Sequence, residues 1–133
     1  MKKTTKIINI GLILFVMLFT YGCGKSQPIQ TTLSVQETDW SELGATKYDP
    51  KVFTPLQRGD LVYDFHDTKI TVKSVTDDNI VLKIDGYMVE KNPDGTVNLN
   101  ADPLKKIELS KAQSVKLASM TMSSGFNLEI SYE

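Results

Sequence analysis

The sequence is poor in the residues that most often carry chemistry. Its 133 residues include one cysteine, Cys23, and one histidine, His66. A single cysteine can form neither an internal disulfide nor a cysteine-rich zinc site. There is also no Gly-x-Ser-x-Gly segment, the turn that presents the nucleophile of many hydrolases. We therefore predict no catalytic residue, no metal and no other cofactor, and we expect a protein that is not an enzyme.

The sequence also lacks an excess of positive charge. Three of the 15 Lys and Arg residues precede position 7, and all 16 Asp and Glu residues follow position 19. After residue 22 there remain 12 basic against 16 acidic residues, a net charge of −4. Nucleic-acid-binding proteins present a basic face, so this balance argues against a nucleic-acid partner.

Long apolar runs are missing except near the N-terminus. Residues 7–19, IINIGLILFVMLF, form an uncharged run of 13 residues after the basic segment MKKTTK. A membrane-spanning helix needs about 20 such residues, whereas the apolar part of a secretory signal peptide has about 7–15. The run therefore predicts a signal peptide.

Gly22 and Cys23, which follow this run, resemble the end of a bacterial prolipoprotein signal peptide. In that class a short lipobox ends in Gly-Cys or Ala-Cys, the thiol receives diacylglycerol, and cleavage leaves the cysteine as the first residue. Thr20 stands where the class usually has leucine, and Tyr21 follows it. The resemblance implies a signal peptide at residues 1–22, lipidation of Cys23, and a lipid anchor in the cell membrane on its extracytoplasmic side.

Two alternatives for Cys23 are a buried apolar thiol and an intermolecular disulfide. The polar segment GKSQPIQTT follows it, and this is not the start of a core. Without processing, the apolar run could remain as a signal anchor with its lysines in the cytoplasm. Either outcome places residues 24–133 outside the cytoplasmic membrane. We interpret residues 23–32 as the lipidated cysteine and a flexible tether, which reaches at most about 30 Å.

Short segments with alternating apolar residues predict an all-β domain at residues 33–133. Turn signals separate these segments at intervals of about ten residues, and no long helical period appears. We expect a small antiparallel β-sandwich or a partly open barrel. The predicted strands are residues 31–37, 61–65, 69–75, 80–85, 105–110, 114–120 and 126–132.

Several local features are predicted inside this domain. Residues 69–85 read as a hairpin with Ile80, Leu82 and Ile84 facing inward, and residues 86–100 read as a second hairpin. The segment TDWSELG at 38–44 predicts one helical turn. Asp39 would cap this turn, Gly44 would end it, and Trp40 would anchor the core beneath it. A change of phase after Leu117 predicts a β-bulge near Ala118.

The segment GD…V…F…ITVKSV, which begins at Gly59, resembles the small immunoglobulin-like or telokin-like domains of Gram-positive lipoproteins. The resemblance covers about thirty residues. It implies a β-sandwich exposed at the cell surface.

His66 lies between Asp64 and Asp67 in the segment YDFHDTK. A metal site would need further ligands, and the chain has no second histidine, so we interpret His66 as part of a solvated turn. Other polar patterns are explained by turns and polar strand faces. They are possible calcium ligands at Asp77, Asp78 and Asn79 or at Asn92 and Asp94, the integrin-type tripeptide Arg58-Gly59-Asp60, and a basic cluster of Lys105, Lys106, Lys111 and Lys116.

The leading hypothesis is a non-enzymatic, lipid-anchored binding module that meets a protein or peptide partner at the cell surface. One alternative is a self-immunity lipoprotein that intercepts a peptide toxin at the membrane. Another is a hydrolase that uses paired carboxylates such as Asp64 and Asp85, which would have to converge in a pocket.

Overall fold

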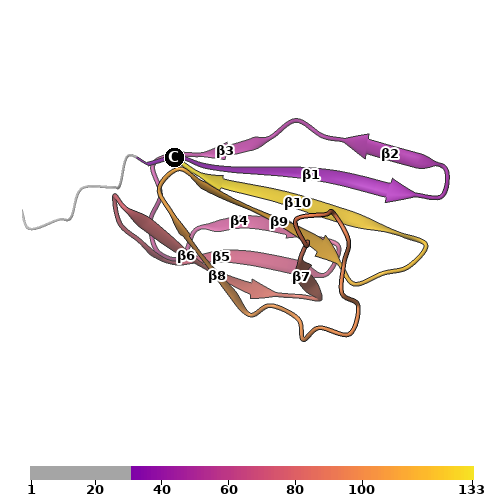
Figure 1. The fold of residues 1–133 in the computed structure, drawn as a ribbon. Helices are drawn as coiled ribbons and strands as arrows, with labels where there is room; N and C mark the ends of the chain where they lie inside the picture. Colours follow the sequence, from indigo (N-terminus) through magenta and orange to yellow (C-terminus); the bar gives the residue numbers. More distant parts are fainter. Residues whose placement is uncertain (1–30) are drawn as a thin grey trace, which may run out of the picture.

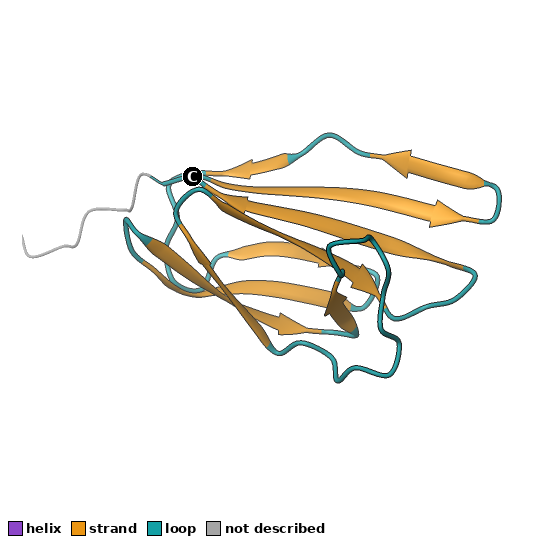
Figure 2. Cartoon of the chain, in the orientation of Figure 1, coloured by secondary structure: helices purple, strands orange, loops and turns teal. Residues whose placement is uncertain are grey.

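The structure, a computed structural model, describes residues 31–133, which form two antiparallel β-sheets packed as a sandwich (Figures 1 and 2). The expected all-β sandwich is confirmed, and the sheets do not close into a barrel. Residues 31–133 contain no helix, and hence none long and apolar enough to cross a membrane. The predicted signal peptide at 1–22 and the lipidation site at Cys23 lie outside the described residues.

The first sheet has the strand order β2-β1-β10-β9-β7, and β3 also pairs with β1. Its centre is the pair β1 and β10, which runs from Leu33 opposite Tyr132 to Ser41 opposite Ser124. The strands are β1 (Leu33–Ser41), β2 (Gly44–Lys47), β3 (Lys51–Phe53), β7 (Met88–Glu90), β9 (Gln113–Ser119) and β10 (Ser124–Tyr132).

The second sheet has the strand order β4-β5-β6-β8. The predicted hairpin at 69–85 is confirmed as β5 and β6, with Val75 opposite Ile80 at the turn. The strands are β4 (Leu61–Phe65), β5 (Thr68–Val75), β6 (Asn79–Asp85) and β8 (Lys106–Ser110).

The core lies between the two sheets and is built from alternating residues of both. Because successive side chains of a strand point to opposite faces, β6, β8 and the second half of β10 bury every second residue. The predicted inward residues Ile80, Leu82 and Ile84 are fully buried, as are Leu128 and Ile130 of β10. This confirms the predicted faces of β6 and β10.

The predicted helical turn at 38–44 is wrong. β1 continues through Ser41, and the chain reverses there into β2, so Asp39 lies in a strand that is paired on both sides. Asp, Ser and Gly are common both at helix ends and in tight turns, so the local sequence fits either structure. The pairing of this segment with β2 and β10 makes it a strand and a turn. Trp40 is correspondingly half-buried and lies outside the core cluster.

The predicted hairpin at 86–100 is only partly present. The turn exists, because the Gly95 N–H donates to the Asn92 carbonyl over 2.8 Å and Gly95 has φ 85°. Residues 96–100 form no strand, however, and β7 pairs with β9 instead. The turn residues specify a reversal of the chain but not the partner of the strand before it.

The bulge predicted near Ala118 is not observed. β9 and β10 pair without a shift from Ala118 opposite Asn127 to Gln113 opposite Tyr132. The register shifts lie in the second sheet, between Leu61 and Tyr63 of β4 and between Val72 and Ser74 of β5. The apolar residues after Leu117 change phase because β9 ends at Ser119.

The described chain starts and ends side by side. The Thr32 N–H donates to the Glu133 carbonyl over 2.8 Å, and the Glu133 N–H donates to the Thr32 carbonyl over 2.9 Å. β4 runs away from this end, so the turn between β4 and β5 lies at the other end of the second sheet (Figure 1).

Candidate functional site

The inner face of β1 changes from apolar to acidic along its length. Leu33 and Val35 are buried in the core, and Glu37 and Asp39 follow with the same period of two. Opposite Glu37 and Asp39 on β10 lie Leu128 and Phe126, which also face inward. Two carboxylates therefore enter the space between the sheets beside apolar neighbours.

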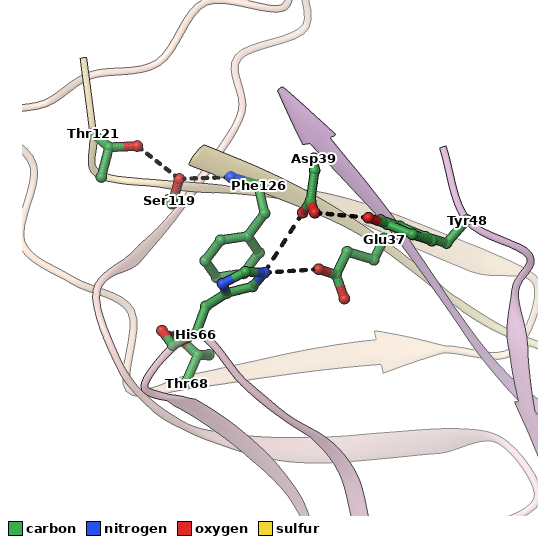
Figure 3. Close-up of polar contacts among 8 residues, drawn as sticks. All are labelled: Glu37, Asp39, Tyr48, His66, Thr68, Ser119, Thr121 and Phe126. Carbon is green, nitrogen blue, oxygen red and sulfur yellow. Dashed lines mark hydrogen bonds and ion pairs between the residues drawn. The ribbon is translucent and has the colours of Figure 1, made fainter. Parts of the chain in front are cut away.

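His66 reaches these carboxylates from the second sheet. It lies in the two-residue turn between β4 and β5, where His66 has φ 50° and Asp67 has φ 57°. Two successive residues with positive φ are typical of the type I′ turn, which matches the twist of a hairpin. The imidazole stacks on Phe126 at 4.6 Å between ring centroids (Figure 3). Phe65 contacts it edge-on at 4.3 Å.

The polar contacts of His66 converge on one ring nitrogen (Figure 3). Its Nε2 lies 3.0 Å from Glu37 Oε1 and 3.6 Å from Asp39 Oδ1. The other oxygen of Asp39, Oδ2, accepts a hydrogen bond from the Tyr48 hydroxyl over 3.0 Å. That hydrogen bond and the charge of Asp39 raise the pKa of Tyr48.

Two polar atoms at this site are shielded from solvent and have no hydrogen-bond partner among residues 31–133. They are Asp39 Oδ1 and the hydroxyl oxygen of Tyr63, a side chain that is only 6% exposed. Burial, and next the negative charge of Glu37, raise the pKa of Tyr63 well above its ordinary value. An unpaired buried polar atom costs about 1–3 kcal/mol, so the site is incomplete as a set of hydrogen bonds.

These residues border a pocket of about 280 Å³. Four of its lining side chains are acids and one is a base, and the remainder are aromatic or apolar. The lining residues are Val35, Glu37, Asp39, Tyr48, Asp49, Lys51, Tyr63, Asp64 and Phe65. The pocket therefore presents a concentrated negative charge next to aromatic rings.

Phe126, on which His66 stacks, is fixed by its own neighbours. Ser119 Oγ accepts the Phe126 N–H over 3.0 Å and shares a 2.9 Å hydrogen bond with the Thr121 hydroxyl. Gly125 packs against the same two side chains. A Cβ at Gly125 would overlap Ser119 Oγ and Thr121 Oγ1 and would lie 3.1 Å from Trp40 Cζ2.

We expect Gly125→Ala to lower the free energy of unfolding by about 1–3 kcal/mol, because the added methyl group overpacks this contact. Urea denaturation measures the effect. The control is Ser124→Ala at the exposed neighbouring position, where we expect a change within about 0.5 kcal/mol. Equal stabilities of the two variants would contradict the close packing around Gly125.

The turn predicted at His66 is confirmed, but the expectation that His66 lacks further ligand groups is wrong. Its partners are Glu37 and Asp39 rather than the flanking Asp64 and Asp67. The interpretation of 38–44 as a helical turn conceals Asp39, whereas Glu37 ends the predicted strand 31–37 without being recognised as a partner of His66. The signal was present, since both acids continue the alternation of the apolar residues before them.

Asp64 and Asp85, the acids of the paired-carboxylate hypothesis, line the same open pocket together with His66 and Lys69. Lys69 lies opposite each of them, on β5 between the two strands that carry them. Both acids are exposed, and Asp85 forms an ion pair with Lys83 over 3.1 Å. Asp85 is therefore already paired with a base, and the paired-carboxylate hypothesis stays a prediction.

The other polar patterns serve turns and strand surfaces. The N–H groups of Asp78 and Asn79 donate to the Thr76 hydroxyl over 3.3 Å and 3.1 Å. Asp94 accepts both the N–H and the hydroxyl of Thr96. Asp60 accepts the Gln57 N–H, which closes the turn that contains Arg58 and Gly59. The four lysines of the basic cluster are exposed; Lys106 lies on β8, Lys116 on β9, and Lys105 and Lys111 directly before and after β8.

Comparison of the chain with protein-family models, with curated proteins and with solved structures finds no match.

Proposed function

We propose that this protein is a lipid-anchored, extracytoplasmic binding module that is not an enzyme and that holds a positively charged ligand or partner group. Its anchor would be diacylglycerol on Cys23, after removal of residues 1–22. The basic start, the apolar run of 13 residues and the Gly22-Cys23 pair support this. One acyl chain binds a membrane only marginally, whereas the two chains of a diacylglycerol give stable anchoring.

The observation that carries the binding function is the acidic pocket on the inner face of β1. Carboxylates placed beside a core lose part of their hydration, and a bound cation would compensate for that loss. The single lysine of the lining, Lys51, does not balance four acids. A positively charged occupant would balance the remaining negative charge of the pocket.

The position of the pocket is compatible with an anchor before Thr31. From Thr31 to Asp39 the chain is extended, so the two residues lie about 25 Å apart at ~3.3 Å per residue. An occupant in the pocket would therefore stay clear of a membrane surface at the Thr31 end. Interception of a cationic peptide toxin would be one instance of the same function.

The chemistry around His66 supports binding rather than catalysis. Among the described residues, the side chains that form polar or ring contacts with the imidazole are Glu37, Asp39, Phe65 and Phe126. None of these is a hydroxyl or thiol nucleophile that a histidine could activate.

The binding function is tested by thermal unfolding of the full-length protein in detergent with a panel of cations. The panel contains a diamine, a guanidinium compound and divalent metal ions. We expect at least one class to raise Tm, because ligands of the folded state stabilise it by mass action. Glu37→Gln should remove the rise, whereas Glu108→Gln, at an exposed position on β8, should keep it. No rise with any class would overturn the cation pocket.

The anchor is tested by the mass of the N-terminal peptide of protein from the native membrane. We expect it to begin at Cys23, to lack residues 1–22, and to be heavier by a diacylglycerol. Cys23→Ala should keep the leader and carry no lipid, even if the apolar run still holds it at the membrane. A wild-type peptide with an unmodified thiol would contradict the lipoprotein assignment.

A further inference from the structure

We propose that the occupant of this pocket is a divalent transition-metal ion, best matched by Zn²⁺, bound by Glu37, Asp39 and His66. This inference rests on the proposed binding function, because it names the ligand of the same pocket. The ligand atoms are Glu37 Oε1, Asp39 Oδ1 and His66 Nε2, which all lie within 4.8 Å of one another. One imidazole and two carboxylates are ordinary ligands of Zn²⁺.

The spacing of these atoms is compatible with a tetrahedral metal ion. Zn–N and Zn–O bonds of about 2.0–2.2 Å place adjacent ligand atoms of a tetrahedral site about 3.3–3.5 Å apart. The two distances from His66 Nε2, 3.0 Å to Glu37 and 3.6 Å to Asp39, lie on either side of this value.

The buried Tyr63 hydroxyl, which has no hydrogen-bond partner among the described residues, is a second indication of a ligand. Asp39 Oδ1 is shielded from solvent, and its carboxylate is held from the other side by the Tyr48 hydroxyl on Oδ2. A metal ion would take the free lone pair of Oδ1, and Tyr48 would orient the carboxylate as outer-shell groups do. The buried Tyr63 hydroxyl faces the same pocket and could donate to a metal-bound water.

The ligands are held by rigid elements before any ion binds. Glu37 and Asp39 lie two residues apart on the doubly paired strand β1, so both face the same side. The imidazole is fixed between Phe65 and Phe126 by the tight turn. Coordination requires the lone pair of Nε2, which places the ring proton on Nδ1.

Three protein ligands leave a fourth position of a tetrahedral ion free, and two of these ligands, Glu37 and Asp39, line the pocket. A water molecule or a donor atom of a partner would complete the shell, as in zinc sites with three protein ligands. The bound ion would thereby allow an acidic pocket to hold a neutral or anionic group.

The test uses the full-length protein in detergent, treated with a chelator that is then removed. Zn²⁺ is titrated in competition with a chromophoric chelator, and Co²⁺ is added separately as a spectroscopic probe. We expect one ion per chain and the visible bands of tetrahedral Co²⁺. His66→Ala and Asp39→Asn should each weaken Zn²⁺ binding at least about 100-fold, more than the loss of an outer-shell group does.

Two further variants distinguish the effect of losing a metal ligand from the effects of misfolding and of a changed pocket charge. Tyr48→Phe keeps all three ligands and should weaken Zn²⁺ binding about 10-fold or more by releasing Asp39. Asp64→Asn removes a charge from the pocket rim without removing a ligand and should change the affinity less than about threefold, as a partly screened charge does. The Tm of each metal-free variant shows that it is folded.

The result that overturns the metal site is absence of stoichiometric Zn²⁺ and Co²⁺ binding, or binding that His66→Ala leaves unchanged. If a diamine or a guanidinium compound nevertheless raises Tm, the cation pocket stands and its metal occupant does not. If no cation raises Tm, both the pocket function and the metal site fail.

Discussion

Replacing Tyr132 with alanine is expected to lower the free energy of unfolding by about 3–5 kcal/mol, as truncation of a buried aromatic residue does. Tyr132 is fully buried near the end of β10. Its hydroxyl shares a 2.7 Å hydrogen bond with Thr31 Oγ1 and donates to the backbone carbonyl of Thr76. The side chain thus joins the first described residue, the last strand and the turn between β5 and β6.

Tyr132→Phe separates packing from hydrogen bonding at this position. It keeps the ring but leaves the Thr76 carbonyl and the Thr31 hydroxyl without this partner, so we expect a loss of about 1–3 kcal/mol. Urea denaturation with a constant m-value measures both changes. A loss below about 1 kcal/mol for Tyr132→Ala would show that the ring does not fill the core.

Leu82→Ala is expected to cost about 2–5 kcal/mol, because the fully buried side chain leaves a cavity between the sheets. Leu82 lies on β6, opposite Val72 on one side and Ile107 on the other. The matched control is Leu43→Ala in the turn after β1, where the leucine is 100% exposed. We expect that change to stay within about 0.5 kcal/mol. Similar effects of the two variants would mean that the inner face of β6 is assigned wrongly.

The parts of the fold that sequence patterns predict are those with local causes. The hairpin at 69–85 follows from two alternating runs around a short turn, and both its pairing and its buried face are confirmed. The pairing of β1 with β10, by contrast, joins segments about a hundred residues apart, and no local pattern names that partner. The same cause explains the error at 38–44, where tertiary pairing overrides a local helical signal.

The candidate site divides in the same way. The turn at His66 was predictable from its neighbours, whereas its contacts with Glu37 and Asp39 depend on how the two sheets are stacked. A strand extended through Asp39 would have predicted that both acids face inward. The arrival of an imidazole from the other sheet would have required the complete topology.

The pairing of Thr32 with Glu133 also determines how the domain would resist a mechanical load. If the domain is pulled at Thr32 and Glu133, the hydrogen bonds between these two residues would break first. The residue pairs of β1 and β10 would then separate one at a time. Pulled between Thr31 and an occupant at Asp39, β1 would be loaded along its axis. The extended backbone of β1 would carry that force, and its hydrogen bonds to β10 would not be separated one after another. A force that a bound ligand exerts on the anchored molecule would therefore act along β1, the direction in which the domain resists it better.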